Sequence, residues 1–441
     1  MLAELQTMTS VASLPARVGR VERISGLIVE AVGLRAAIGD LCSLGACAGS
    51  PGSNLAEVVA VRGDTITLLP FAELRGLALG ALVHASGPSP DIAVGTELLG
   101  RVIDGFGAAL DGKPLPRLGD RQPLRREAPA ALQRPRIDTL LESGVRCIDA
   151  LLTLGRGQRV GIFSGSGVGK STLLGMMARQ ADADFNVIAL IGERGREVRE
   201  FIEEQLGAEG LKKSIVVVAT SDQAAPMRIR AAYAAVALAE WLRDRGASVL
   251  LTMDSITRLA MARREIGLSA GEPPTARGYT PSVFAELPAL CERLGAAEGG
   301  GAITGLLTVL VEGDDFNEPI SDCLRATLDG HIVLSRELAH QAHYPAIDVL
   351  KSSSRVMDGL IPDAERDTVH RTRATLALLA RHRQMIEIGA YDAGSNAGLD
   401  RAIGLEPALR DFLCQGREVL PRDAAMRRLQ AIVGNGKDGE R

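Results

Sequence analysis

The 441-residue chain has few aromatic residues, no cysteine cluster and no excess of positive charge. Aromatic residues make up 3% of it, which is too little for the stacking platforms that commonly bind single-stranded nucleic acid. The 50 basic and 54 acidic residues give a net charge of -4, without the positive excess typical of nucleic-acid-binding domains. Composition therefore disfavours a nucleic-acid-binding protein, although it does not speak against a local basic patch.

The sequence also contains no cysteine pattern typical of a metal site and no apolar run long enough for a signal peptide or a membrane span. The six cysteines, at positions 42, 47, 147, 291, 323 and 414, form no Cys-x-x-Cys pair and no zinc-like spacing with histidine, so we expect reduced, mostly buried thiols. The longest apolar run, residues 231–239, falls far short of the roughly 20 residues of a membrane span. The first residues lack the apolar stretch of a signal peptide. We therefore expect a cytoplasmic protein that meets membranes only peripherally.

The order of apolar patterns predicts three folded domains. After an N-terminal segment, 1–17, short alternating stretches within residues 18–90 predict strands at 20–22, 27–32, 57–61 and 65–69. These strands fit either a small β-barrel or an antiparallel sheet packed on the next domain. Helical spacing of apolar residues after position 362 predicts helices at 368–388, 400–413 and 424–433, and so a helical domain over 366–441.

The middle of the chain, residues 91–365, has the alternating strand and helix patterns typical of an α/β domain. Residues 100–129 are rich in Gly, Pro and Arg and are interpreted as a linker on a domain surface. From about residue 144 apolar strands alternate with helical segments such as 226–243, which predicts a mostly parallel sheet. The expected strands are 159–163, 186–191, 215–219, 249–253, 303–311 and 331–334.

The most informative segment is a phosphate-binding loop (P-loop) at residues 164–172, Ser-Gly-Ser-Gly-Val-Gly-Lys-Ser-Thr, between a predicted strand and a predicted helix. Its glycines let backbone N–H groups face phosphate oxygens at a helix N-terminus. Lys170 would reach the β- and γ-phosphates and the Ser171 hydroxyl would hold Mg²⁺, with Thr172 the second choice. Ser164 replaces the first glycine of the strict pattern, yet the Lys-Ser pair and the flanks disfavour an unrelated hairpin. The predicted nucleotide-binding residues are Gly165, Ser166, Gly167, Val168, Gly169, Lys170, Ser171 and Thr172.

Two carboxylates follow predicted strands. Asp254 ends the apolar run 248–254 and is the expected Mg²⁺ partner, although an apolar run that ends in Asp is common. Glu193 lies at a strand tip, where it could orient and polarise the attacking water, and Arg194 beside it could neutralise phosphate charge. The alternative for this Glu-Arg run is a surface ion-pair cluster.

At this point the sequence resembles a known family, the ATPases of type III protein export, which are related to the rotary ATP synthase catalytic subunits. The resemblance covers nearly the whole chain after residue 18 and looks closest to the flagellar export ATPases. It implies an N-terminal barrel, a RecA-like core, a helical C-terminal domain and a homohexameric ring. It also implies that Glu193 is the catalytic carboxylate, Arg194 a neighbour of the γ-phosphate, Arg355 an arginine finger reaching the adjacent subunit, and Tyr344 the ring that packs on adenine. The motifs that carry it lie at 161–171, 192–197, 271–279, 311–315, 329–335, 343–348 and 352–355.

The expected function is therefore Mg²⁺-dependent ATP hydrolysis that energises chaperone release, unfolding and export of flagellar proteins. The alternatives are an injectisome ATPase of the same family, a ring helicase or RNA translocase, and a rotary ATP synthase subunit. The last is disfavoured because residues 388–396 replace the acidic loop with which rotary subunits engage the rotor. The expected partners are further copies of the chain, a stator-like regulator, chaperones with cargo and the export gate at the inner membrane.

Two further segments have open interpretations. The Gly- and Pro-rich loop 271–281 could face a pore and contact cargo, or could be an ordinary connector. The basic stretch with Arg371, Arg373, Arg381 and Arg383 could meet an acidic partner, although a solvated helix face is the common reading of such a run.

Overall fold

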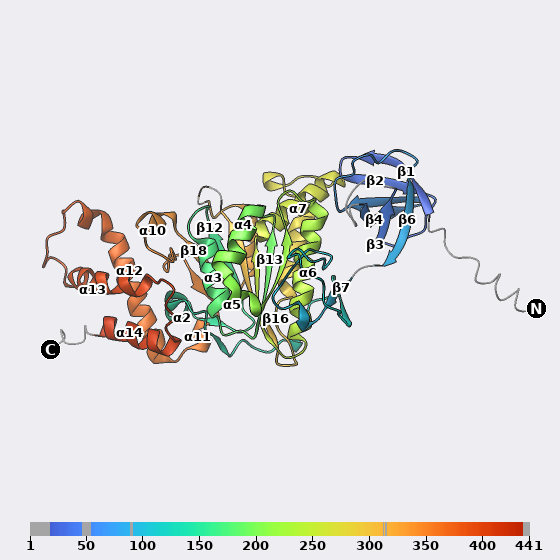
Figure 1. Cartoon of the computed structure of the whole chain (residues 1–441). Helices are drawn as coiled ribbons and strands as arrows, with labels where there is room; N and C mark the ends of the chain where they lie inside the picture. The colour runs from blue at the N-terminus through green and yellow to red at the C-terminus, as the bar shows by residue number, and fades with distance from the viewer. Residues whose placement is uncertain (1–17, 46–53, 89–90, 312, 314, 435–441) are drawn as a thin grey trace, which may run out of the picture.

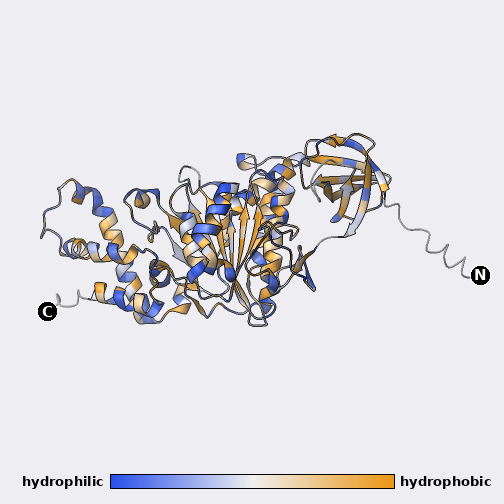
Figure 2. Ribbon diagram, viewed as in Figure 1, coloured by the Kyte–Doolittle hydropathy of each residue, from blue (hydrophilic) through white to orange (hydrophobic). Residues whose placement is uncertain are grey.

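The structure, a computed structural model, describes residues 18–45, 54–88, 91–311, 313 and 315–434. The three parts lie in a row, with a β-barrel at one end, a central α/β domain and a group of helices at the other end (Figure 1). The N-terminal segment 1–17, Cys47, and the Glu312 and Asp314 positions of the 311–315 motif lie outside the described residues. In Figure 2 apolar residues concentrate on the central strands, as expected for a sheet covered on both faces.

The N-terminal strands close into a barrel in the order β1-β2-β5-β4-β3-β6, which decides between the two arrangements left open by the sequence. Alternate side chains of β4, such as Ala56 and Val58, point into a small core of the barrel's own. β3 and β6 were absent from the expected strands because the first is short and flanked by glycines, and the second contains Ser, Gly and Pro. The strands are β1 (Val18–Ser25), β2 (Ile28–Val32), β3 (Asp40–Leu44), β4 (Leu55–Arg62), β5 (Thr65–Pro70) and β6 (Leu82–Pro88).

The segment between barrel and core is partly built into the core. β7 (Asp91–Val94) and β9 (Asp120–Pro123) form a two-stranded sheet, but β8 (Arg101–Ile103) pairs in parallel with β14 at the edge of the central sheet. The interpretation of residues 100–129 as a surface linker is therefore wrong for β8. The charged Arg101 suggested an exposed segment, but its guanidinium is buried and donates to the Asp111 carboxylate at 2.7 and 2.9 Å.

The central sheet has nine strands in the order β19-β18-β12-β17-β15-β13-β14-β8, with β16 paired to β17. All pairs are parallel except those of the two-residue strands β16 and β19, which confirms the expected mostly parallel sheet. The remaining strands of this sheet are β12 (Arg159–Ser164), β13 (Phe185–Ile191), β14 (Ser214–Ala219), β15 (Ser248–Asp254), β16 (Gly295–Ala296), β17 (Ala302–Leu310), β18 (Gly330–Leu334) and β19 (Ser353–Ser354).

Helices cover both faces of this sheet. Successive residues of β13 belong to different apolar clusters: Ala189 packs with α6 (Ala225–Arg243) and α7 (Ile256–Ser269), and Leu190 with α3 (Lys170–Gln180). The Ala-rich α6 permits close approach, since a Cβ on Gly105 would lie 2.9 Å from the Ala231 nitrogen. Other elements of the domain are α2 (Arg146–Leu151), α4 (Gly195–Glu200), η3 (Phe201–Leu206), α5 (Gly207–Lys212), α8 (Pro281–Glu292), α9 (Pro319–Thr327), α10 (Arg336–His340), α11 (Met357–Leu360), β10 (Leu140–Leu141) and β11 (Leu154–Gly155), with 3-10 turns η1 (Thr96–Leu98), η2 (Ala131–Gln133) and η4 (Ala276–Gly278).

The C-terminal helices α12 (Asp363–Glu387), α13 (Ala397–Leu413) and α14 (Arg422–Gly434) share a hydrophobic core with the central domain. Phe412 and Met426 belong to the same cluster as Ile148 of α2. α12 begins earlier than expected because Pro362 precedes it and acidic residues occupy its first turn. We therefore place the domain boundary before Asp363. Among the described helices, none is long and apolar enough to cross a bilayer.

Candidate nucleotide-binding site

The P-loop lies between β12 and α3, in the strand-loop-helix context that the sequence predicted. Gly167 and Gly169 have φ angles of 77° and 87°, a left-handed conformation that glycine adopts without strain, and α3 begins immediately afterwards at Lys170. Val168 is buried and anchors the loop, whereas Ser166, Ser171 and Thr172 are exposed. Backbone N–H groups at a helix start, beside exposed hydroxyls, suit an anion.

Lys170 meets both predicted carboxylates. Its Nζ lies 2.5 Å from Asp254 Oδ1 and 3.8 Å from Glu193 Oε1, and all three side chains are nearly buried. The residues come together because β12, β13 and β15 are parallel strands whose carboxyl ends share one edge of the sheet. One cation thus balances two carboxylates at the start of α3.

The environment of Glu193 perturbs its ionisation. Burial, with a contribution from the nearby Asp254 charge, raises the pKa of Glu193 to about 7, against the opposing effects of Lys170 and Arg258. The ionised form, which is needed to accept a hydrogen bond from water, therefore increases as the pH rises through 7. A carboxyl group with a pKa near neutrality is suited to proton transfer, because both protonation states are accessible.

Two further residues of the site were missed by sequence reasoning. Thr308, in the middle of the apolar β17, donates its hydroxyl to Asp254 Oδ1 at 2.7 Å. Arg258 lies in the first turn of α7 and is packed so close to Gly192 that a Cβ there would be 2.9 Å from Arg258 Cβ. The sequence signal that could have identified Arg258 is its position. Helix α7 starts directly after the strand that ends in Asp254, so the first turn of α7 faces the carboxyl edge of the sheet.

The donor set is compatible with Mg²⁺. No group of three or more His, Cys, Asp or Glu side chains able to hold a metal occurs among the described residues. Magnesium at phosphates needs no such group, because it commonly takes one or two protein oxygens and completes its shell with phosphate and water. The Asp254 carboxylate and the Ser171 hydroxyl, next to the helix start, provide oxygens of that kind.

Tyr344 and Arg194 differ in their placement relative to the loop. A Cβ on Gly169 would lie 3.4 Å from Tyr344 Cδ1, so the half-exposed tyrosine ring borders the P-loop. The Arg194 side chain is 74% exposed and pairs with Glu197 at 3.4 Å. The structure therefore places Tyr344 next to the P-loop, whereas the Arg194 guanidinium is paired with Glu197.

Arg355 lies at the other end of the sheet. It follows β19, which pairs with the start of β18, and Gly330 of β18 is in register with Val160 near the start of β12. The P-loop begins at Ser164, roughly 13 Å further along the strand at about 3.3 Å per residue. The exposed Arg355 side chain donates to the Arg325 carbonyl at 2.8 Å and is remote from its own P-loop.

The two segments with open interpretations have contacts within the chain. In loop 271–281, Arg277 forms an exposed ion pair with Asp315 at 2.5 Å. On α12, Arg373 donates to the Ser352 carbonyl at 3.2 Å and Arg383 pairs with Glu406 at 3.7 Å. Arg277 in the loop, and Arg373 and Arg383 in the basic stretch, therefore have partners within the chain.

A P-loop at the carboxyl edge of a mostly parallel sheet, with a carboxylate at the end of β15, which β17 separates from the P-loop strand, defines a P-loop nucleotide-binding protein with a RecA-like core. Residues 144–354 match the profile of the ATP synthase alpha/beta family, nucleotide-binding domain, and residues 361–431 that of the T3SS EscN ATPase C-terminal domain. The chain belongs to the flagellar and type III secretion ATPases of the ATP synthase alpha/beta family.

Individual relatives agree over nearly the whole chain. The flagellum-specific ATP synthase of Bacillus subtilis (strain 168) is 52% identical over 420 residues, 95% of this chain and 96% of the relative. The type 3 secretion system ATPase of Xanthomonas euvesicatoria is 48% identical, covering 92% and 91%. The assembled ATPase EscN of the enteropathogenic E. coli type III secretion system has a TM-score of 0.88 at 43% identity, over 94% of this chain and 100% of that chain. The expected family, fold class and activity, ATP hydrolysis in type III protein export, are confirmed.

Proposed function

We propose that this chain is the ATPase that energises export of flagellar proteins and that it hydrolyses MgATP at a site completed by a neighbouring copy. The observation that carries the proposal is the pairing of Lys170 with Asp254 and Glu193 at the P-loop edge, with Arg355 at the opposite end of the sheet. This arrangement supports nucleotide binding and water activation within one subunit, whereas Arg355, which donates to the Arg325 carbonyl at 2.8 Å, would serve the site of another subunit.

The binding step follows from the charges. The γ-phosphate of ATP would compete with the carboxylates for Lys170, and the N–H groups of residues 165–170 would cradle the β-phosphate. Asp254, which Thr308 keeps oriented, and Ser171 are the residues that would hold Mg²⁺ once Lys170 has turned to the phosphate. When bound, Mg²⁺ neutralises charge on the β- and γ-phosphate oxygens.

Hydrolysis assigns different roles to the remaining groups. Ionised Glu193 accepts a hydrogen bond from the attacking water and orients it towards the γ-phosphorus. Arg258, already packed beside Gly192, opposes the negative charge that develops on the phosphoryl group. Arg194 would join it only after leaving Glu197, and Tyr344 would pack on the adenine ring.

Arg355 is proposed to act in the site of an adjacent subunit within a homohexameric ring. An arginine supplied in this way neutralises transition-state charge and contributes about three to five powers of ten in rate. The assembled form of EscN, and its complex with the central stalk EscO, support a ring with a stalk-like partner for this chain. Further proposed partners are a stator-like regulator, chaperones with cargo and the membrane export gate, which would place the ring at the cytoplasmic side of the inner membrane.

The test is ATP hydrolysis per subunit against protein concentration, for wild type, Arg355→Ala, and an equimolar mixture of Arg355→Ala with Glu193→Gln. We expect activity to rise with concentration and to be partly restored in the mixture, because each variant supplies the group that the other lacks. Flat activity, with no restoration in a mixture that co-assembles, would refute a site shared between subunits.

Flagellar and injectisome roles need a separate experiment, because relatives with either name are similarly identical to this chain. The Xanthomonas euvesicatoria secretion ATPase and the Treponema pallidum flagellar protein are both 48% identical. Deleting the gene and scoring filaments by electron microscopy distinguishes them. Loss of filaments supports the flagellar proposal, and normal filaments with loss of effector secretion support the injectisome alternative.

A further inference from the structure

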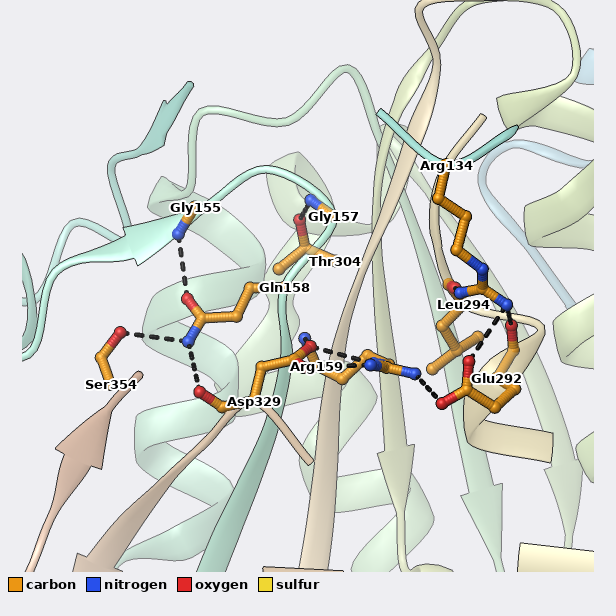
Figure 3. Close-up of polar contacts among 10 residues, drawn as sticks. All are labelled: Arg134, Gly155, Gly157, Gln158, Arg159, Glu292, Leu294, Thr304, Asp329 and Ser354. Atoms are coloured by element: carbon orange, nitrogen blue, oxygen red, sulfur yellow. Dashed lines mark hydrogen bonds and ion pairs between the residues drawn. The ribbon is translucent and has the colours of Figure 1, made fainter. Parts of the chain in front are cut away.

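A buried glutamine at the start of the P-loop strand holds the backbone segment that carries Arg355. Gln158 is fully buried and immediately precedes β12 (Figure 3). Its Nε2 group donates to the Asp329 carbonyl at 3.2 Å and to Ser354 Oγ at 3.0 Å, while its Oε1 accepts from the Gly155 N–H at 3.0 Å. The side-chain amide therefore bridges the start of β12 to the residue directly before Arg355.

The two residues to which Gln158 donates, Asp329 and Ser354, adjoin the Arg355 backbone through a hydrogen bond and through the chain. The Arg355 N–H donates to the Asp329 carbonyl at 2.9 Å, the same oxygen that Gln158 binds. Ser354 forms the last pair of the β18–β19 ladder, opposite Gly330. Space there is tight, because a Cβ on Gly330 would lie 2.7 Å from the Ser353 carbonyl oxygen and 3.1 Å from Gln158 Nε2.

The same junction is anchored by charge. The Arg159 guanidinium makes two hydrogen bonds to the Asp329 carboxylate, at 2.9 and 3.0 Å, and a third, at 2.5 Å, to Glu292 at the end of α8. Arg134 approaches Glu292 from the other side, with an ion pair at 3.1 Å (Figure 3). Arg159, held in turn by Glu292, thus fixes Asp329. Of the side chains drawn in Figure 3, Gln158 is the one that also contacts Ser354.

We propose that Gln158 is a positioning residue for Arg355. It keeps β19 in register with β18 and β12, so that Arg355 is presented in one orientation to the neighbouring subunit. The inference rests on the proposed action of Arg355 in a neighbouring site. It adds that the defect caused by losing Gln158 appears in the neighbour's site and not at the P-loop of the altered chain.

The test uses Gln158→Met, which preserves the length and apolar volume of the side chain but removes both N–H donors and the oxygen that accepts from the Gly155 N–H. We expect kcat to fall about tenfold to a hundredfold, since displacing a catalytic group by about 1 Å can cost a factor of that size. Affinity for a fluorescent MgATP analogue should stay within about twofold, because the P-loop contacts are unchanged. Gln122→Met is the matched control: Gln122 lies on β9, its Nε2 has no hydrogen-bond partner among the described residues, and we expect wild-type kcat.

The decisive measurement is mixing with Glu193→Gln. In randomly assembled rings about one quarter of the interfaces pair an intact P-loop with a correctly held Arg355, so activity should rise to about a quarter of wild type. If Gln158 supports only the fold or its own P-loop, no interface is intact and the mixture stays at the level of its components. That outcome, or loss of nucleotide affinity in Gln158→Met alone, would overturn the inference.

A second variant and a parallel mixture keep the result interpretable. If Gln158→Met does not fold, Ser354→Ala removes the acceptor of the same hydrogen bond, together with the bond that the Ser354 hydroxyl donates to the Thr153 carbonyl at 2.8 Å, and should give a defect that Glu193→Gln also rescues. The parallel mixture contains Arg355→Ala and Glu193→Gln. Rescue there, without rescue of the Gln158 or Ser354 variant, refutes only the positioning role. Absence of rescue in both refutes the action of Arg355 in a neighbouring site, and this inference with it.

Discussion

Replacing Lys170 with Met should destabilise the central domain even without nucleotide, because Lys170 is the cation that balances two nearly buried carboxylates. Its Nζ lies 2.5 Å from Asp254 and 3.8 Å from Glu193. Removing one partner of a buried ion pair commonly costs about 3–5 kcal/mol, since the remaining charge stays buried. Because Thr308 still donates to Asp254 in the variant, we expect a loss of unfolding free energy at the lower end of this range, about 3 kcal/mol at pH 8.

The pH dependence has a definite sign. The pKa of Glu193 is raised to about 7 from an ordinary value of 4.5, so its protonated form favours the folded state and this contribution is lost as pH rises through 7. Lys170 offsets part of this loss of stability because its positive charge stabilises ionised Glu193. Its removal should therefore cost less at pH 6, about 2 kcal/mol, because Glu193 then takes up a proton.

The assay is urea unfolding in EDTA without nucleotide, at pH 6 and pH 8. Trp241 is the only tryptophan and lies nearly buried in α6, so its fluorescence reports the central domain. With a slope of about 3 kcal/mol per molar urea, the midpoint should fall by about 1 M at pH 8. Lys212→Met, which removes an exposed pair with Glu209, is the control and should leave the midpoint unchanged.

Two results would refute this reasoning. The first is a Lys170→Met midpoint equal to wild type at pH 8, and the second is a larger shift at pH 6 than at pH 8. The double variant Lys170→Met/Asp254→Asn provides a further check. It should recover most of the lost stability, because no uncompensated charge then remains on Asp254.

Three further predictions concern single groups. Glu193→Gln should retain binding of a fluorescent ATP analogue but lose phosphate release by at least about a hundredfold, as expected when water is no longer activated; wild-type turnover would contradict the role. Iodoacetamide applied to the native protein should modify half-buried Cys414 before Cys147, because burial raises the pKa of Cys147 to about 12, and peptide mass spectrometry reports the order. Arg293→Met should lower the free energy of unfolding by about 3 kcal/mol, and so the urea midpoint by about 1 M, by leaving buried Glu240 unpaired, and adding Glu240→Leu should restore most of the lost stability.

The sequence predicted the P-loop, its strand and helix, and the approach of Asp254 because these depend on short-range pattern. Two local motifs can be recognised without knowledge of distant contacts: Lys-Ser after a glycine-rich loop, and an apolar run that ends in Asp. Strand β8 was not predictable in this way, because Arg101 becomes compatible with a sheet edge only when Asp111 folds back on it. Closure of the barrel likewise requires β1 to pair with β6, more than fifty residues later at Val18 and His84.

Arg258 and Thr308 could not be assigned from the sequence for a different reason. Each is an ordinary residue for its element, an arginine on a helix and a threonine in a strand. Their role follows only from the order of strands in the sheet, which places β17 between β12 and β15. Thr308 thus reaches Asp254 from the strand that separates it from the P-loop strand.

The arrangement of hydrophobic cores indicates how the nucleotide site is connected to the rest of the chain. The barrel has a core of its own, whereas the C-terminal helices share theirs with the central domain. The Tyr344 carbonyl accepts a hydrogen bond from the Gln415 N–H at 2.9 Å, and the Gln415 side chain binds the Arg146 N–H at 2.7 Å and the Gly144 carbonyl at 2.8 Å. The Tyr344 ring can rotate without disturbing these bonds, but a shift of its backbone would either break them or carry the start of α2 and the segment after α13 with it. The second course disrupts fewer buried polar contacts, so a backbone shift at Tyr344 would be transmitted to the helical domain.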